Sequence, residues 1–443
     1  MAEFGWEFWL LVAAILIAAW TVGVYLLNRK GLLEPRGLHP AGPFIMWKTK
    51  RGRDFLDRLS RPTRFWKIFG DFSLVLVGLT MVGTTLLLAW EATLVQSPAV
   101  RQNPPSPDLL LGLPGINRLI PFGYGVFGLA IAIVLHEFAH GILARAAKVP
   151  LRSLGILLFI VPIGAFVEPD EEEMKKMPRR ERARLYAVGP ATNIVLAVIF
   201  AVLFSTVMMG SVSPVHAGVG IVGFPEDGPS PARDAGIDPF TIITSYNGTE
   251  VRSYADFIRA RDLTKANDTV NVTVYDGTAY RNVTLVLADD GSGGALLGIY
   301  AIDTTTEYYH PLSNPDRFGG VPGAVLTYIS LPFGGYAPIP EPRLQFYEIH
   351  GPLAAIPAPL FWLIGNAVYW LFWLNVMLGA TNALPAVPLD GGYIFKDAVE
   401  GFLARARKGL GLEARDRIVR NVSYLFALFI LSLILWQLIG PRI

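Results

Sequence analysis

The sequence predicts a mainly α-helical, polytopic membrane protein with about six transmembrane helices and one inserted soluble domain of mixed α/β structure. Hydrophobic residues make up 52% of the 443 residues and charged residues only 17%, which is too apolar for an ordinary soluble enzyme of this length. Uncharged apolar segments of transmembrane length recur along the chain. One long stretch between them instead alternates β-branched and polar residues, as in Thr269–Tyr275 and Tyr280–Leu287 on either side of an Asp276-Gly277 turn, which is typical of strands.

Composition also excludes several classes of function. The formal net charge of +2 gives no reason to expect a nucleic-acid partner. The chain has no cysteine, which excludes disulfides, thiol nucleophiles and cysteine-ligated zinc. Any metal ion must therefore be held by histidine and carboxylate side chains.

Six segments are candidates to span about 30 Å of hydrocarbon. Lysine and arginine gather in 29–67 and 396–420, which the positive-inside rule places in the cytoplasm. We therefore expect a multi-pass protein of the cell membrane with its N-terminus outside. A cleaved signal peptide is the alternative for the first segment, but only Glu3 and Glu7 carry charge ahead of it. The six segments are Phe8–Leu27, Phe72–Trp90, Phe122–Lys148, Leu185–Met209, Ala355–Thr381 and the short Val422–Leu438.

The span Phe122–Lys148 carries His136, Glu137 and His140 in its second half. Ionisable groups at that depth are costly and indicate function. Two histidines four residues apart lie on one face of a helix, so that both imidazoles can reach one metal ion, and Glu137 would then act as general base on a water. The pattern by itself also permits a structural ion pair. Arg145 and Lys148 end the helix and place the site below the cytoplasmic surface, inside the membrane.

Two segments, separated by a charged linker, are candidates to contact a substrate. The apolar segment Gly155–Val167 is too short to cross and is expected to be re-entrant and extended, either pairing with an unwound substrate or serving as a packing loop. The charged segment Glu168–Arg184 is expected to be a solvated cytoplasmic linker. In the next span, Asn193 follows Gly189-Pro190; its amide could join helices, orient a substrate or stabilise an oxyanion.

The strand-rich stretch resembles a PDZ domain around Pro229–Phe257. A Ser-Pro-Ala helix start, a strand through Ile242 and Ile243, an Asn247-Gly248 turn and a second helix carry this resemblance. It implies a peptide-binding domain with a carboxylate-binding loop near Gly218–Ile221 that takes a peptide C-terminus, and counting the spans from the N-terminus places this domain outside the cell. A steric plug over the active site is the alternative. His39, His216, His310 and His350 have nothing at ligand spacing around them and are not expected to bind metal.

The last membrane region contains N-A-L-P-A-V-P-L-D-G-G, from Asn382 to Gly392. Its prolines stop the preceding helix and leave backbone that should line a cavity. Asp390 either caps a helix that begins near Tyr393 or supplies the third ligand to the metal of His136 and His140. We favour the ligand, because two histidines at similar depth need one.

His136-Glu137-Phe138-Ala139-His140, the Gly189-Pro190 to Asn193 element and Leu389-Asp390-Gly391 together resemble the signature of site-2 proteases, which are zinc-dependent intramembrane proteases. The resemblance implies one Zn²⁺ per chain on His136, His140 and Asp390, Glu137 as the base that activates water, and Asn193 and Asn382 assisting substrate binding. It also implies transmembrane regulatory proteins as substrates. Ala165-Phe166 stands where many relatives have Gly-Tyr.

These inferences divide the chain into four regions. The N-terminal membrane region 1–210 carries HEFAH and GPATN, the PDZ-like domain 211–303 follows, 304–354 is an external interfacial segment, and the C-terminal membrane region 355–443 carries NALPAVPLDGG. A membrane transporter of divalent metal or protons is the alternative function. It would use the same buried cluster but would not require a glutamate beside the first histidine.

Overall fold

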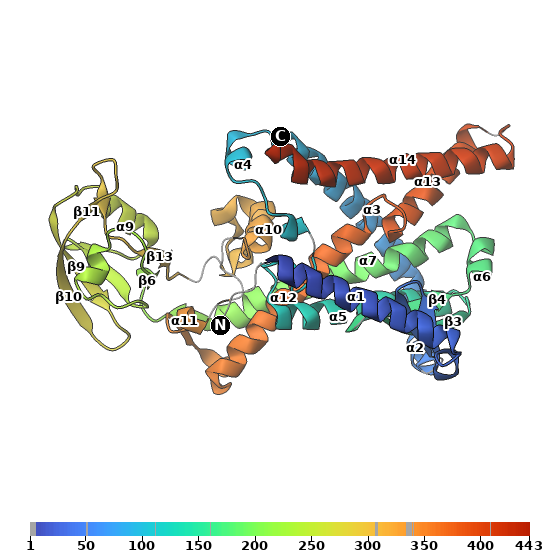
Figure 1. Cartoon of the computed structure of the whole chain (residues 1–443), viewed down its shortest axis with the longest axis horizontal. Coiled ribbons are helices and arrows are strands. Elements are labelled where there is room, and N and C mark those ends of the chain that lie inside the picture. Colours follow the sequence, from blue (N-terminus) through green and yellow to red (C-terminus); the bar gives the residue numbers. More distant parts are fainter. Residues whose placement is uncertain are drawn as a thin grey trace. The chain divides into compact units, whose positions relative to one another are not determined.

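The computed structural model describes residues 6–49, 52–110, 112–159, 161–305, 309–333, 339, 341–407 and 409–443. The chain forms two compact units, one of residues 1–198 with 371–443 and one of residues 199–370 (Figure 1). The first unit contains most of the long helices and one small sheet, and the second contains the larger sheet.

Five helices are long and apolar enough to cross a membrane, which confirms the mainly helical membrane class. They match five of the six predicted spans. The remaining prediction, Phe8–Leu27, lies in α1 (Trp6–Arg29), a helix whose side chains are described only from Ile15 onward. The five are α3 (Thr63–Leu94), α5 (Phe122–Ala146), α7 with the turns that follow it (Arg179–Ser211), α12 (Ala358–Asn382) and α14 with its last turn (Leu412–Arg442).

Shorter helices of the first unit connect these long ones. The charged segment after Glu168, for which the sequence predicted a solvated linker, forms α6 and the first turns of α7, and Asp170 caps α6 by accepting from the N–H groups of Glu172 and Glu173. The short helices are α2 (Arg53–Leu59), α4 (Pro98–Gln102), α6 (Glu171–Lys176) and α13 (Asp390–Ala406).

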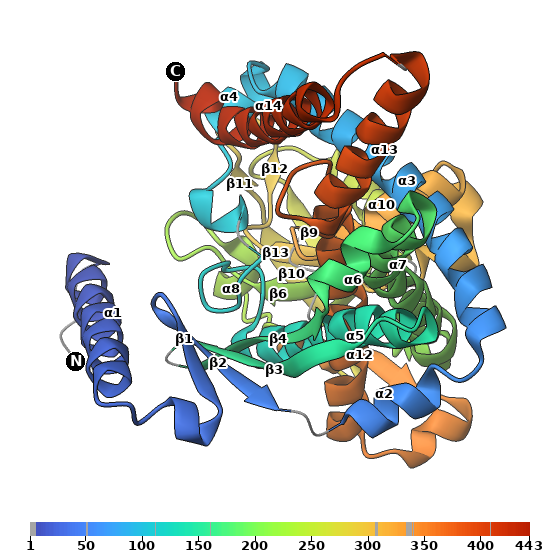
Figure 2. The same ribbon diagram turned by 90° about the vertical axis from the view of Figure 1, so that its right-hand side faces the viewer.

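An antiparallel sheet in the order β1-β2-β3-β4 lies along α5, with β4 at its edge (Figure 2). The extended segment predicted at Gly155–Val167 is thus the hairpin of β3 and β4. Strands were not expected in the basic segment before it, where partners from about a hundred residues further on complete the ladder. The strands are β1 (Leu38–Ala41), β2 (Phe44–Thr49), β3 (Leu151–Phe159) and β4 (Val161–Pro169).

Glycine is required where β2 crosses β3. A Cβ on Gly155 would meet the carbonyl oxygen of Trp47 at 2.0 Å and the ring of Phe166 at 2.9 Å. No side chain larger than hydrogen fits this close approach. Gly155 therefore permits β2 to pair with β3.

The larger sheet of the second unit has the order β10-β9-β7-β6-β13 and covers a core of aliphatic and aromatic side chains. Both strands predicted around the Asp276-Gly277 turn form, and so do the two helices and the turn expected in 229–257. The elements are β6 (Val219–Gly223), α8 (Pro231–Asp234), β7 (Ile242–Tyr246), β8 (Thr249–Glu250), α9 (Tyr254–Arg261), β9 (Thr269–Tyr275), β10 (Tyr280–Val286), β11 (Ala288–Asp289), β12 (Ala295–Leu296) and β13 (Tyr300–Asp303).

The predicted position of the carboxylate-binding loop, near Gly218–Ile221, is wrong. Residues 219–221 belong to strand β6, which pairs on one side with β7 and on the other with β13. The N–H of Gly218 donates to Thr304 Oγ1 at 3.0 Å, and the N–H of Ile221 donates to the carbonyl of Thr241 at 2.9 Å. Since these donors already have partners in the sheet, they are not free for a peptide carboxylate.

Residues 304–354 contain short regular elements where the sequence showed no period. The N–H of Val215 donates to the carbonyl of Phe346 at 2.9 Å, beside a two-stranded pairing of β5 with β14. Tertiary partners, not local propensity, therefore order this segment. Its elements are α10 (Gly320–Ser330), α11 (Glu341–Leu344) and β14 (Tyr347–Ile349), and β5 is Val212–Pro214.

Candidate metal centre

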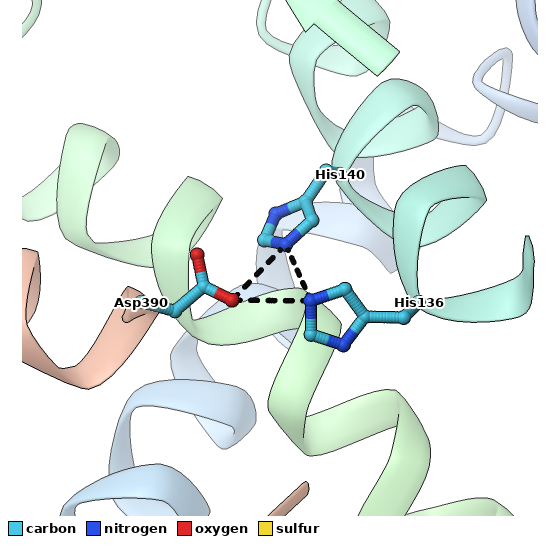
Figure 3. Close-up of side chains that lie close together, drawn as sticks. All are labelled: His136, His140 and Asp390. Atoms are coloured by element: carbon cyan, nitrogen blue, oxygen red, sulfur yellow. Dashed lines mark hydrogen bonds and ion pairs between the residues drawn. The ribbon is translucent and has the colours of Figure 1, made fainter. Parts of the chain in front are cut away.

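The predicted ligands His136, His140 and Asp390 converge on one point (Figure 3). Asp390 Oδ2 lies 3.1 Å from His136 Nε2 and 3.3 Å from His140 Nε2, and the two Nε2 atoms are 3.2 Å apart. Both imidazoles project from α5, and the carboxylate comes from the first residue of α13, 254 residues along the chain. This is the one group of three such residues at ligand spacing in the described part of the chain.

The donor set fits zinc. Zinc bonds to histidine nitrogen and carboxylate oxygen are about 2.0 to 2.2 Å long, so two ligands of a tetrahedral ion stand about 3.3 Å apart. The three separations of 3.1 to 3.3 Å match that edge length. Two neutral imidazoles and one carboxylate also leave a fourth position open, as catalytic zinc sites require.

Hydrogen bonds on the far side of each ring fix the tautomer that metal binding needs. His136 Nδ1 lies 2.7 Å from Asn193 Oδ1, and His140 Nδ1 lies 2.6 Å from the carbonyl oxygen of Leu185. Both partners are acceptors, so each Nδ1 carries the proton and donates it. Each Nε2 lone pair is then directed at the common point, and its basicity is raised by the partner of Nδ1.

Asn193 is the centre of a buried amide relay between three helices. Its oxygen accepts from His136, and its Nδ2 donates to Asn375 Oδ1 at 2.9 Å and to the carbonyl of Ala132 at 3.2 Å. Asn375 Nδ2 in turn donates to the carbonyl of Leu371 at 2.7 Å. Asn193 and Asn375 are both fully buried. Every polar atom of the Asn193 amide is thus engaged within the protein, and its predicted contact with a substrate stays a prediction.

Gly189 lets α7 pack directly against the imidazoles. A Cβ at this position would meet His140 Nε2 at 2.3 Å and His136 Nε2 at 2.7 Å. Any larger residue would therefore occupy the space between the ligand atoms. This explains the glycine of the Gly189-Pro190 element, to which the sequence alone assigned no contact.

The side chain of Asp390 does not cap a helix, which was the alternative role predicted for it. Helix α13 begins at Asp390 itself, and the capping position, Leu389, makes no side-chain cap. The two glycines that follow allow the helix start to fold back on the preceding turn. A Cβ on Gly391 would meet the carbonyl oxygen of Ala383 at 2.2 Å, and one on Gly392 would meet the amide nitrogen of Val387 at 2.4 Å.

Ion pairs between α7 and α13 hold the helix that carries Asp390. Arg182 binds Asp397 with two hydrogen bonds, of 2.6 and 2.9 Å, and the Arg182 and Asp397 side chains are only 17% and 9% exposed. One turn away, Arg179 Nη2 donates to Glu400 Oε1 at 2.7 Å. Because both pairs join the same two helices, they fix α13 against the helix that carries Asn193.

The rings of Tyr186 and Tyr393 add an aromatic contact between α7 and α13. They stack with their centroids 4.9 Å apart and their planes inclined by 17°. The stack lies in the first turn of α13, three residues after Asp390.

Glu137, the predicted base, lies next to the ligands on α5 and faces the sheet. Its Oε2 accepts from the backbone N–H of Val167 in β4 at 3.0 Å. The adjacent Glu168 is held by Lys48 Nζ at 2.9 Å and by the hydroxyl of Ser153, and these hydrogen bonds keep the pKa of Glu168 below its ordinary value. Strand β4 is thus anchored beside Glu137.

The other predicted site residue stands apart from the ligands. Asn382 Nδ2 donates to the carbonyl of Leu378, within its own helix, at 3.1 Å. No histidine outside α5 belongs to a group of three residues at ligand spacing among the described residues. Those histidines are His39, His216, His310 and His350.

Sequence reasoning missed Asn375, Arg182 and Asp397 as parts of the site. Asn375 was visible as a polar residue within an apolar span, but its partner lies 182 residues earlier. The charge of Arg182 was hidden among the mixed charges of its segment, and Asp397 lies 215 residues from it. A pattern of mixed charges along the sequence does not reveal which residues form an ion pair when they lie that far apart in the chain.

Known proteins resemble the chain over most of its length. Residues 124–430 match the sequence pattern of peptidase family M50. An uncharacterized protein of Methanocaldococcus jannaschii is 22% identical over 90% of this chain and 88% of its own length. The zinc metalloprotease Rip1 of Mycolicibacterium smegmatis is 24% identical over 66% of this chain and 90% of its own length. Since the pattern spans more than half of the sequence and includes all three ligand residues, the chain belongs to peptidase family M50, the site-2 protease family of zinc metalloproteases.

Proposed function

We propose that this protein is an intramembrane endopeptidase that hydrolyses peptide bonds within transmembrane segments of membrane-anchored regulatory proteins. The observation that carries the proposal is the position of the metal group. His136 and His140 lie on α5, an apolar helix of 25 residues, and not in a water-soluble domain. A peptide bond that reaches these ligands must therefore lie within the hydrocarbon region or come from it.

His136, His140 and Asp390 hold the zinc ion in this mechanism. When bound, zinc supplies a Lewis acid that activates a water and polarises the scissile carbonyl. Glu137 takes a proton from the attacking water and passes it to the leaving amine nitrogen. The Val167 N–H holds Oε2 of this carboxylate, so the other oxygen is the one that carries the proton.

Strand β4 is the proposed docking edge for the unwound substrate. Helical amides are shielded by their own hydrogen bonds, so the substrate must become extended before it can be cleaved. β4 ends the order β1-β2-β3-β4, and its outer edge faces α5, because the Val167 N–H reaches Glu137. A peptide added to this edge pairs its backbone beside the base.

The same proposal fixes orientation and partners. Arg145 ends the metal-bearing helix, which supports placing the ligands toward the cytoplasmic side and the PDZ-like domain 211–303 outside. That domain either recruits peptide C-termini or limits access to the site. One zinc ion serves each chain, and the bilayer and transmembrane proteins are the partners.

Cleavage of a model transmembrane substrate by the wild type and by Glu137→Gln, with zinc content measured in both, tests the proposal. We expect the variant to lose at least about 100-fold in rate, the usual contribution of a general base, while keeping its zinc, because Glu137 is not a ligand. A soluble peptide serves as the control substrate. Equal rates for the two proteins on the transmembrane substrate would refute the assignment.

A further inference from the structure

Every asparagine between residues 211 and 303 begins the acceptor motif for N-linked oligosaccharides, Asn-x-Thr with x other than proline. Only 14 of these 93 residues are serine or threonine, so random placement would give fewer than one such motif among four asparagines. The other nine asparagines of the chain include one motif, Asn421-Val422-Ser423. The motif is therefore concentrated in the PDZ-like domain. Its four asparagines there are Asn247, Asn267, Asn271 and Asn282.

The fold leaves these four side chains accessible. All four asparagines are exposed, two of them in turns and two on strands. None of them donates a hydrogen bond to a described residue from Nδ2, the atom to which a sugar is attached. Asparagines of the membrane helices differ, because Nδ2 of Asn193 and Nδ2 of Asn375 both donate to oxygen acceptors. A large polar substituent on the exposed side chains would therefore displace no internal hydrogen bond.

Asn271 and Asn282 face the same side of the β9 and β10 pair. Asn271 stands opposite Thr284, and Asn282 stands opposite Thr273, so each asparagine is paired with the threonine of the other motif. Thr273 Oγ1 donates to Asn282 Oδ1 at 2.8 Å. The valines between these residues point to the other face and belong to the core of the domain. The polar face can therefore carry substituents while the apolar face keeps its packing.

Local structure explains each half of the motif but not the combination. Asn247 and Asn267 have positive φ values, of 48° and 69°, a conformation that asparagine tolerates better than most residues. That accounts for the two asparagines, but not for the threonine that follows each of them two positions later. In β9 and β10 the reverse holds, since threonine is favoured in strands and asparagine is depleted there. The acceptor motif is the explanation common to all four positions.

We propose that Asn247, Asn267, Asn271 and Asn282 are acceptors of N-linked oligosaccharides. This assignment rests on the proposed orientation, which puts residues 211–303 outside the cell. A membrane transferase would take the oligosaccharide from a lipid diphosphate carrier. The bond between the anomeric carbon and the diphosphate oxygen breaks, and a bond from that carbon to Nδ2 forms. Nδ2 loses one proton to the solvent, and the lipid diphosphate is released.

The oligosaccharides would cover the exposed face of the strand pair at one end of the sheet. Strand β10 ends the order β10-β9-β7-β6-β13, so one of its edges is unpaired in that sheet. Exposed strand edges are templates for pairing with another chain. Bulky, solubilising substituents beside this edge therefore protect the domain from edge-to-edge association.

Mass spectrometry of peptides from the full-length protein, purified from its own cells, tests the four sites. We expect a glycan mass on each of the four asparagines and none on Asn421. Asn421 is the internal control, because it lies on the membrane-length helix α14 and Oγ of Ser423 is bound to the carbonyl of Val419 at 2.8 Å. Four unmodified asparagines, or equal modification of Asn421, would overturn the proposal.

A matched pair of variants tests the motif itself. Thr284→Val removes the hydroxyl from the Asn282 motif and keeps a β-branched side chain at this exposed strand position, whereas Thr284→Ser keeps the hydroxyl. We expect only Thr284→Val to lose the glycan of Asn282, with the glycans of the other three sites unchanged in both variants. A glycan retained on Asn282 in Thr284→Val would refute its assignment as a motif-dependent acceptor.

Two cysteine variants separate a wrong orientation from a wrong acceptor assignment. The chain has no cysteine, so Leu263→Cys, 85% exposed in the PDZ-like domain, and Phe402→Cys, 69% exposed on α13, each introduce a single thiol. We expect an impermeant maleimide to label only Leu263→Cys in intact cells. Unmodified asparagines in a chain labelled at Leu263→Cys would refute the sites and leave the orientation intact. Labelling of Leu263→Cys only after cell rupture would refute the orientation, and cleavage of the transmembrane substrate tests the peptidase activity independently.

Discussion

Asn193 shows how far a single residue's role depends on its neighbours. On the sequence it is a polar residue in an apolar span, equally able to join helices or to contact a substrate. In the structure its oxygen is 2.7 Å from His136 Nδ1, and its nitrogen binds Asn375. The amide therefore reaches the candidate metal site through the imidazole of His136.

Replacement of Asn193 by alanine should weaken zinc binding. His136 would lose the acceptor that fixes its tautomer, and loss of such a partner typically costs about 10- to 100-fold in metal affinity. Competition with a chelating dye, after removal of endogenous metal, measures this affinity. Asn382→Ala is the matched control, because Asn382 binds only a carbonyl of its own helix, and it should keep wild-type zinc affinity. Equal affinities in all three proteins would contradict the positioning role.

At the scale of the element, the pairing of α7 with α13 determines where Asp390 stands. Gly391 and Gly392 let the start of the helix approach the backbone of the preceding turn closely, and the Arg182 and Asp397 pair holds the body of the helix. Asp397 stands seven residues after Asp390 and therefore lies on the same face of α13. A change in the ion pair should therefore be felt at Asp390.

Arg182→Met should destabilise the protein by about 3 to 5 kcal/mol, because it leaves the carboxylate of Asp397 buried without a partner. Asp397→Leu in the same chain removes that charge, and we expect the double variant to recover most of the loss. Thermal unfolding in detergent, followed for the two single variants and the double variant, gives the coupling energy. Strictly additive losses would show that the pair does not fix α13.

The position of β4 at the edge of the sheet leads to a separate prediction about catalysis. Ala165 and Val167 are two residues apart, so their N–H groups point to the same side of the strand, toward α5. Proline is tolerated on an edge, but it removes this donor. Ala165→Pro should therefore lower cleavage of a transmembrane substrate and leave zinc content unchanged, whereas Ala165→Val, which keeps the N–H, should cleave it normally. Full activity in the proline variant would argue against pairing of the substrate with this strand.

At the scale of the whole molecule, one metal ion would join segments that are 254 residues apart. Ions that bind only the folded state stabilise it by mass action. Zinc at 100 times its dissociation constant adds about 2.7 kcal/mol to the free energy of unfolding. We therefore expect a chelator to lower the melting temperature and added zinc to restore it.

Asp390→Asn provides the control for this experiment. The variant keeps the fold but lacks the anionic ligand, so its melting temperature should respond much less to chelator and to zinc. If the wild type and Asp390→Asn respond equally, the stabilising ion is bound elsewhere.

The sequence by itself determined the membrane class and the chemistry of the ligands. Both are local properties: composition and segment length decide whether a helix suits a bilayer, and a spacing of four residues places His136 and His140 on one face of it. Asp390 was also predicted, because His136 and His140 required a third ligand. The strands predicted around Asp276-Gly277 formed for the same local reason, an alternating pattern bounded by a turn.

Only the tertiary structure decided which contacts hold these residues in place. The hydrogen bond between Asn193 and Asn375, the Arg182 and Asp397 pair, and the pairing of β2 with β3 each join residues about a hundred or more positions apart. The PDZ-like carboxylate loop was misplaced because the N–H groups of Gly218 and Ile221 found partners within the sheet. Hydrogen bonds between distant segments form only when the chain has folded, and no local pattern in the sequence records them.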